Sequence, residues 1–413
     1  MTESKVKKIL AAISRYGFRA GIQNAVARWA YSELKVPQDV WGDYSWILKT
    51  DRPATNRPPA NGPLHINWLI PDVIEASGGL LNVLRAIYHL EKWGHRHRIY
   101  VMDKAVTDSQ EITNFVRQRY FPITTEIEVF RGQVVDSDAL VATHWSTAYA
   151  ARALSNTAGK FYFVQDLEYL FYAAGSFCEF VKQTYQWGFR GITLGPWIAD
   201  MLRREFQMPC TPFGFSYDHD IYTLQGPRHF SEDRRRVLFY ARPRTERRGF
   251  ELGILALSLV AEKRPDVDFI LVGFPPKSIN LPFRATMPGV LPPRDLAALY
   301  RSCSLALVLS YTNLSLLPLE LMACGCAVVS NRGSNVEWLL TEQTSQLTDS
   351  NPEALAEGIL ALLDNDSERV NKITAGRKLA GATDWVSEIR TIEAAFYAGL
   401  QMTREQAQFV GLS

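Results

Sequence analysis

A basic loop is the first segment whose residue types suggest chemistry. Between Arg228 and Arg248, eight arginines outnumber three acidic residues by five. Because the planar guanidinium group matches phosphate oxygens, this charge fits a diphosphate. A solvated basic loop is the alternative, and it stays open for residues 234–236. It is less favoured for Arg242 and Arg248, which lie beside the end of an expected strand.

A pair of glycines, Gly78 and Gly79, follows an expected strand and opens an expected helix. Glycine lets a phosphate approach the backbone N–H groups that the first turn of a helix leaves unpaired. The pair is not part of a Gly-x-Gly-x-x-Gly motif, so a nicotinamide cofactor is not indicated. A glycine needed only for the geometry of a turn is the alternative explanation.

One carboxylate, Glu320, stands in an apolar segment and is the only charged residue between Arg301 and Arg332. A lone carboxylate in such surroundings requires hydrogen-bond donors, and vicinal sugar hydroxyls are suitable ones. The alternative is an internal salt bridge with an arginine, for instance one from the basic loop.

These groups must be positioned by alternating strands and helices. Apolar runs and loop signals predict a strand, helix and strand over residues 64–101, and the alternation continues to about residue 205. It lapses over residues 213–236 and then restarts. We therefore expect an α/β protein with two Rossmann-like, doubly wound domains facing across a cleft, with ligands at the carboxyl ends of the strands. The expected divisions are 1–63 (helical extension and Pro-rich linker, part of the first domain), 64–221 (first Rossmann-like domain), 222–384 (second Rossmann-like domain) and 385–413 (helices packing back on the first domain).

Composition excludes several classes of partner. The 413 residues are 47% hydrophobic and 21% charged with a net charge of +2, so no global field would hold nucleic acid. The start lacks the apolar core of a signal peptide, which favours a cytoplasmic location. The five cysteines and seven histidines form no zinc-binding pattern, so we expect buried free thiols and no metal site. Two Asp-x-Asp matches, at Asp136 and Asp218, are expected to be turn or capping residues.

The first 35 residues combine seven basic residues with two acidic ones and interleave them with apolar positions. This pattern predicts a basic amphipathic helix or helix pair. It could contact an anionic membrane at the inner face, or pack on its own domain with a solvated basic face.

The segment 310–330 resembles the nucleotide-sugar motif of the retaining family-four glycosyltransferases of GT-B fold, and the resemblance covers most of the chain after residue 64. It implies that residues 64–221, together with 1–63, form the acceptor domain and that residues 222–384 form the nucleotide-sugar donor domain. The same resemblance implies that Glu320 binds the ribose hydroxyls of the donor, that Arg242 and Arg248 clamp its diphosphate, and that Gly78 and Gly79 lie under the phosphates. It also implies donor contacts from the loop and turn residues Thr312, Asn313, Leu314, Ser315, Val290 and Leu291.

The sequence departs from the family pattern at two places. Thr312, with Asn313 beside it, stands where the family has the first glutamate of a Glu-x7-Glu motif, and a deoxy sugar would tolerate that loss. Gln165 replaces the histidine of a short motif that lines the reaction centre, and Asp166 follows it. The resemblance makes both candidates for catalytic residues. Asp166 as the cap of a helix over residues 167–174 is the alternative.

These departures resemble the rhamnosyltransferases that polymerise rhamnan. The resemblance implies transfer of L-rhamnose from dTDP-β-L-rhamnose to a rhamnan or lipid-linked glycan, with retention and without a divalent metal or other cofactor, in biosynthesis of a surface glycan such as an S-layer glycan. The alternatives are another nucleotide-sugar-dependent hexosyltransferase, a nucleotide-sugar epimerase and a non-catalytic glycan-binding scaffold. The oligomeric state is left open.

Overall fold

The structure, a computed structural model, describes residues 39–55, 62–74, 77–103, 108–231, 234–274 and 279–410, without the side chains of 402–410. Residues 1–50 and 51–413 form separate compact units. In the described part of the first unit, helix α3 (Val40–Tyr44) precedes a short 3-10 helix, η1 (Ser45–Leu48). The amphipathic helix expected within residues 1–35 lies outside the described residues.

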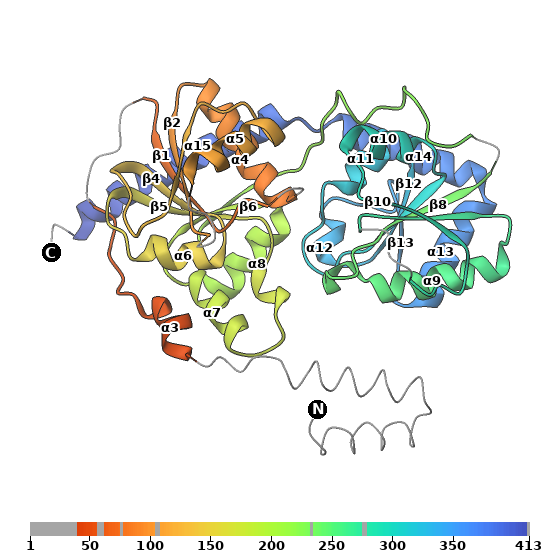
Figure 1. The fold of residues 1–413 in the computed structure, drawn as a ribbon, viewed down its shortest axis with the longest axis horizontal. Helices are drawn as coiled ribbons and strands as arrows, with labels where there is room; N and C mark the ends of the chain where they lie inside the picture. Colours follow the sequence, from red (N-terminus) through yellow and green to blue (C-terminus); the bar gives the residue numbers. More distant parts are fainter. Residues whose placement is uncertain are drawn as a thin grey trace, which may run out of the picture. The chain divides into compact units, whose positions relative to one another are not determined.

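The second unit contains two parallel sheets. In the described residues the first sheet has seven strands in the order β3-β2-β1-β4-β5-β6-β7, so the order reverses between β1 and β4. Helices α4, α5 and α15 lie on one face, and α6, α7 and α8 lie on the other (Figure 1). The strands are β1 (His65–Ile70), β2 (Arg96–Val101), β3 (Glu126–Val129), β4 (Ser137–Ala142), β5 (Thr157–Val164), β6 (Arg190–Leu194) and β7 (Cys210–Phe213), and the helices are α4 (Gly78–Lys92), α5 (Ser109–Arg119), α6 (Trp145–Arg152), α7 (Ser176–Thr184), α8 (Pro196–Phe206) and α15 (Trp385–Val410).

The second sheet has six strands among the described residues, in the order β10-β9-β8-β11-β12-β13, with the reversal between β8 and β11. Helices α9 and α13 lie on one face, and α10, α11 and α14 on the other (Figure 1). The strands are β8 (Arg236–Tyr240), β9 (Asp268–Val272), β10 (Ala285–Gly289), β11 (Leu305–Val308), β12 (Ala327–Asn331) and β13 (Gln346–Thr348), and the helices are α9 (Phe250–Lys263), α10 (Pro293–Arg301), α11 (Leu317–Ala323), α12 (Ser334–Glu337), α13 (Pro352–Asp364) and α14 (Asp366–Gly381).

The apolar runs of the sequence form the centres of both sheets. Every residue of β4, β11 and β12 is buried, as expected for strands covered by helices on both faces. After the second sheet the chain returns, and α15 contacts α4, β5 and β7 of the first. The expected pair of doubly wound, parallel α/β domains is thus confirmed.

Other expectations need correction or qualification. The helix expected over residues 167–174 is only a 3-10 helix, η2 (Glu168–Phe171), because Leu167 is not helical, with ψ at 87°. Four of the five cysteines are buried, whereas Cys210 is half-buried. Within the described residues, no helix is long and apolar enough to cross a bilayer.

Candidate functional site

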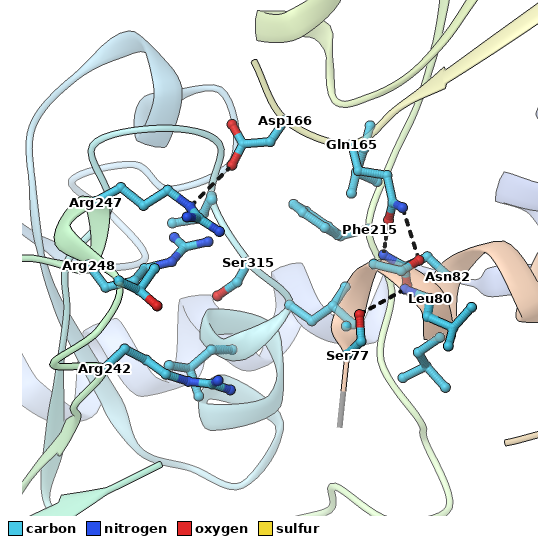
Figure 2. Close-up of a pocket in the computed structure, with 18 of the residues that line it drawn as sticks. Ser77, Leu80, Asn82, Gln165, Asp166, Phe215, Arg242, Arg247, Arg248 and Ser315 are labelled. Atoms are coloured by element: carbon cyan, nitrogen blue, oxygen red, sulfur yellow. Dashed lines mark hydrogen bonds and ion pairs between the residues drawn. The ribbon is translucent and has the colours of Figure 1, made fainter. Parts of the chain in front are cut away.

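A cleft of about 670 Å³ lies at the carboxyl ends of both sheets. Its walls come from the segments after β1, β4 and β5, the start of α4, the segments after β8 and β11, and α11. Figure 2 shows arginines on one side, facing the beginning of α4 on the other. The predicted site residues that line the cleft are Gly78, Gly79, Gln165, Asp166, Arg242, Arg248, Leu314, Ser315 and Glu320.

The cationic wall consists of Arg242 after β8 and of Arg247 and Arg248 at the end of η3 (Glu246–Arg248). Arg248 donates from Nη1 to Ser310 Oγ at 2.5 Å and to the carbonyl of Asn313 at 3.2 Å. Burial lowers the pKa of Arg248 to about 10, which still leaves it charged at neutral pH. Arg247 lies over the ring of Phe171, 3.9 Å from its centroid. The wall therefore presents three cations in fixed places.

Other arginines of the basic loop serve a different purpose. Arg235 contacts Asp366 at 2.6 Å, and Arg234 and Arg236 both contact Asp268. The solvated basic loop considered for residues 234–236 fits only Arg234 and Arg235, which are exposed and ion-paired, whereas Arg236 is buried at the start of β8. None of the three lines the cleft. Only part of the charge excess seen in the sequence reaches the cleft.

Asp166 connects the segment after β5 with the loop after β11. Its carboxylate accepts hydrogen bonds from the hydroxyl of Thr312 at 2.7 Å, the N–H of Asn313 at 2.9 Å and the N–H of Leu167 at 2.8 Å. Arg247 Nε lies 3.9 Å from the same carboxylate. Burial raises the pKa of Asp166, and these donors oppose the rise. Protein groups already engage both carboxylate oxygens, which is the geometry of a residue that positions a loop.

Thr312 and Asn313 are buried and lie behind the cleft surface. The Asn313 amide donates to the carbonyls of Gln165 at 3.1 Å and Leu194 at 2.8 Å, and it accepts from Trp338 Nε1 at 3.2 Å. These bonds fix the loop whose next residues, Leu314 and Ser315, line the cleft. No hydrogen bond within the described residues uses the N–H group of Leu314 or Ser315. Among the described residues, both N–H groups therefore lack a protein partner.

Gln165 points toward the start of α4 (Figure 2). Its amide donates to the carbonyl of Gly79 at 2.9 Å and accepts from the amide of Asn82 at 3.0 Å. The helix itself begins at Gly78, where Ser77 Oγ accepts the N–H of Leu80 at 3.3 Å. Gln165 thus anchors the glycine turn, and Ser77 and Asn82 are cleft residues that the sequence analysis missed.

Glu320, on α11, occupies the apolar part of the cleft. Burial, reinforced by the like charge of Asp218, raises the pKa of Glu320 to about 8, while a hydrogen bond from Tyr222 opposes the rise. Among the described residues, no basic side chain lies within ion-pair distance of Glu320. The internal salt bridge considered for this residue is therefore absent there.

Val290 and Leu291 follow β10 and are not among the residues that line the cleft. The side chain of Val290 is 59% exposed, and Leu291 packs against the apolar core. The structure therefore does not bring either residue into the lining of the cleft, and their contact with the base of the donor stays a prediction.

A buried carboxyl that the sequence analysis missed also lines the cleft. Glu168 accepts hydrogen bonds from the N–H of Trp145 at 2.7 Å and from the hydroxyl of Tyr162 at 2.9 Å. Burial raises the pKa of Glu168 to about 8. Sequence spacing could not reveal this role, because Trp145 and Tyr162 approach Glu168 only through the parallel pairing of β4 and β5.

The Asp-x-Asp segments have structural partners. Asp138 lies in β4 and accepts the N–H of His65 at 2.8 Å, and Asp218 pairs with Arg85 at 2.6 Å. The part of the chain that the structure describes holds no cluster of three metal-ligating side chains.

Two doubly wound sheets with a ligand cleft at their carboxyl ends define the GT-B fold. Solved structures with this fold include the following two. Sucrose-phosphate synthase from Thermosynechococcus elongatus is 16% identical with a TM-score of 0.59, covering 84% of this chain and 100% of that one. The Anabaena protein HepE, solved with UDP-glucose, is 14% identical with a TM-score of 0.58, covering 85% and 100%.

Sequence similarity is narrower. Residues 235–360 match the family described as WsaF, C-terminal domain. The O-antigen biosynthesis protein RfbC of Myxococcus xanthus is 33% identical over 257 residues, which is 61% of this chain. The chain spans only 20% of the length of that relative.

Proposed function

We propose that the chain is a glycosyltransferase of surface-glycan biosynthesis. It transfers L-rhamnose from dTDP-β-L-rhamnose to a rhamnan or lipid-linked glycan, with retention of configuration. The observation that carries the class is the cationic wall of Arg242, Arg247 and Arg248, opposite the amino end of α4. Fixed cations and helix amino ends stabilise a departing diphosphate without reorganisation.

Several findings support the more specific terms. The matches to the WsaF C-terminal domain and to an O-antigen biosynthesis protein support surface-glycan synthesis. The neighbour solved with UDP-glucose supports a nucleotide-sugar donor. Thr312 is uncharged and buried, and its hydroxyl donates to Asp166. At this position the site therefore offers no carboxylate to a sugar hydroxyl, which suits a deoxy sugar that lacks one.

Each part of the donor has residues suited to it. The diphosphate meets the arginines and the N–H groups of Leu314 and Ser315, while Glu320 accepts from the 3′-hydroxyl, the one free hydroxyl of the donor's deoxyribose. Asp166 and Gln165 act as positioning residues, the first for the loop after β11 and the second for the glycine turn. Because arginines supply the positive charge, we propose that transfer needs no divalent metal.

The test is a calorimetric screen of nucleoside diphosphates and nucleotide sugars, followed by transfer assays with synthetic rhamnosides. We expect thymidine-linked rhamnose to bind most tightly and to be turned over. Turnover of a different donor would replace the sugar assignment and keep the class. Tight nucleotide binding without transfer or hydrolysis of any thymidine- or uridine-linked donor would favour a glycan-binding scaffold, and formation of an epimeric nucleotide sugar would favour an epimerase.

A further inference from the structure

Two polar side chains stand at the point where the strand order of the first sheet reverses. Asp72 follows β1 and His144 follows β4, and these neighbouring strands lie on either side of the reversal. Both side chains line the cleft. In doubly wound sheets, chain segments leave such a point in opposite directions and open a crevice that receives ligands.

His144 is held in a defined orientation as the N-cap of α6. Its Nδ1 accepts the backbone N–H of Ser146 at 3.3 Å and lies 2.8 Å from Ser146 Oγ, whose hydroxyl donates to it in the tautomer that this cap requires. In that tautomer the proton of the neutral ring resides on Nε2. Thr147 completes a capping box by accepting the backbone N–H of His144 at 3.0 Å. Burial lowers the pKa of His144 to about 4, which keeps the ring neutral. Ser, Thr, Asp and Asn are the usual N-cap residues. Their side chains are shorter, so none of them can present an N–H group as far from the backbone as Nε2 of histidine does.

Asp72 provides the complementary group. Within the described residues, neither its carboxylate nor the Nε2 atom of His144 has a hydrogen bond or ion pair, and no hydrogen bond contributes to the pKa shift of either group. The two groups are close enough for the charged form of each to favour the charged form of the other, while burial, and to a smaller extent Asp103, raises the pKa of Asp72. A carboxylate acceptor and an N–H donor therefore face the cleft without partners of their own.

We propose that Asp72 and His144 bind the hydroxyl groups of the acceptor saccharide. Neighbouring sugar hydroxyls offer both a donor, for the Asp72 carboxylate, and an acceptor oxygen, for the N–H of His144 Nε2. A phosphate is a poor ligand here, because Asp72 repels an anion and His144 carries no charge. The donor's phosphates meet the three arginines contributed by the second sheet, so the two substrates occupy different walls. This assignment rests on the proposed glycosyl transfer.

The experiment compares the full chain with Asp72→Asn and His144→Asn. Asn at 144 can still cap α6, so the helix is retained while the Nε2 donor is lost. Asp200→Asn is the matched control, since this carboxylate lies on α8, its side chain is 69% exposed and it is not among the residues that line the cleft. Transfer to p-nitrophenyl α-L-rhamnoside, hydrolysis of the donor without acceptor, and calorimetric binding of dTDP are measured for each protein.

We expect each site variant to raise the acceptor KM roughly tenfold, as for loss of one hydrogen bond to a charged or buried partner. Donor hydrolysis and dTDP affinity should change by less than about twofold, and the control should behave as wild type. An unchanged acceptor KM, or an equal loss of dTDP affinity, would overturn the assignment.

Binding of methyl α-L-rhamnoside to the dTDP complex, followed by ligand-observed NMR, needs no turnover. If the wild-type chain transfers no sugar, the proposed function fails. The NMR signal still decides this assignment: its loss in both site variants but not in the control supports it, and its persistence, or its absence in the wild type, contradicts it.

Discussion

Donor binding should release a proton from Glu320. Burial raises the pKa of this carboxyl to about 8 in the ligand-free cleft, so at pH 7 about nine-tenths of the molecules carry it protonated. The 3′-hydroxyl of the donor's deoxyribose, donating to the carboxylate, favours its charged form and lowers the pKa toward its ordinary value. The proton must then leave when the donor binds.

The free-energy cost of deprotonating Glu320 follows from the difference between its pKa in the ligand-free cleft and the pH. Deprotonating a group one unit below its pKa costs about 1.4 kcal/mol, so affinity at pH 7 should be about tenfold weaker than the limit reached at high pH. At pH 6 the loss should approach about a hundredfold.

The assay is calorimetric titration with dTDP-rhamnose between pH 6 and 9, repeated in buffers of different ionisation enthalpy. The sugar nucleotide is preferred to dTDP, because each of its phosphates has one ester and one anhydride bond and therefore no proton that titrates in this range. Glu320→Gln keeps the shape of the side chain and should bind with weak pH dependence and no proton release. If wild type and Glu320→Gln show the same proton release and the same pH slope, Glu320 does not bind the deoxyribose hydroxyl.

Three further predictions concern other residues. Arg248→Ala should weaken dTDP binding by about 1.5–3 kcal/mol, as for a charge-assisted hydrogen bond, whereas Arg235→Ala, outside the cleft, should leave calorimetric affinity unchanged; equal effects would refute the clamp. Asp166→Ala should lower kcat/KM for the donor by about ten- to a hundredfold, and adding Thr312→Val should cost little more, because both remove the same contact; additive losses would show separate roles. Glu168 keeps its proton in the folded chain between pH 4.5 and about 8 and loses it on unfolding, so the free energy of unfolding should fall as pH rises through that window, by up to about 1.4 kcal/mol per unit. Glu168→Gln should flatten that slope in denaturant titrations, and an unchanged slope would place the ionisation elsewhere.

The sequence predicted the central strands better than the edge strands. Strands such as β4 and β11 are buried on both faces and appear as continuous apolar runs. The edge strands β3 and β13 and the Pro-containing β7 are short, and β3 alternates glutamate with apolar residues, so no run marks them. Periodicity detects burial on two faces, and a strand at the border of a sheet has only part of that burial.

The same limit applied to the site. Arg248 lies in the segment after β8, and Glu320 lies on the helix after β11. Both could be predicted to reach the cleft, because the segments that follow parallel strands begin at the same edge of the sheet. The engagement of Asp166 with Thr312 joins residues 146 positions apart, and the cap formed by His144 depends on a hydrogen bond that no spacing rule requires. Sequence thus identified the charged wall that a diphosphate needs. The opposite wall, where we propose that Asp72 and His144 bind hydroxyl groups, became visible only when the first sheet brought the ends of β1 and β4 together. No sequence motif marks these two residues, and the proposed role depends on their being neighbours in space.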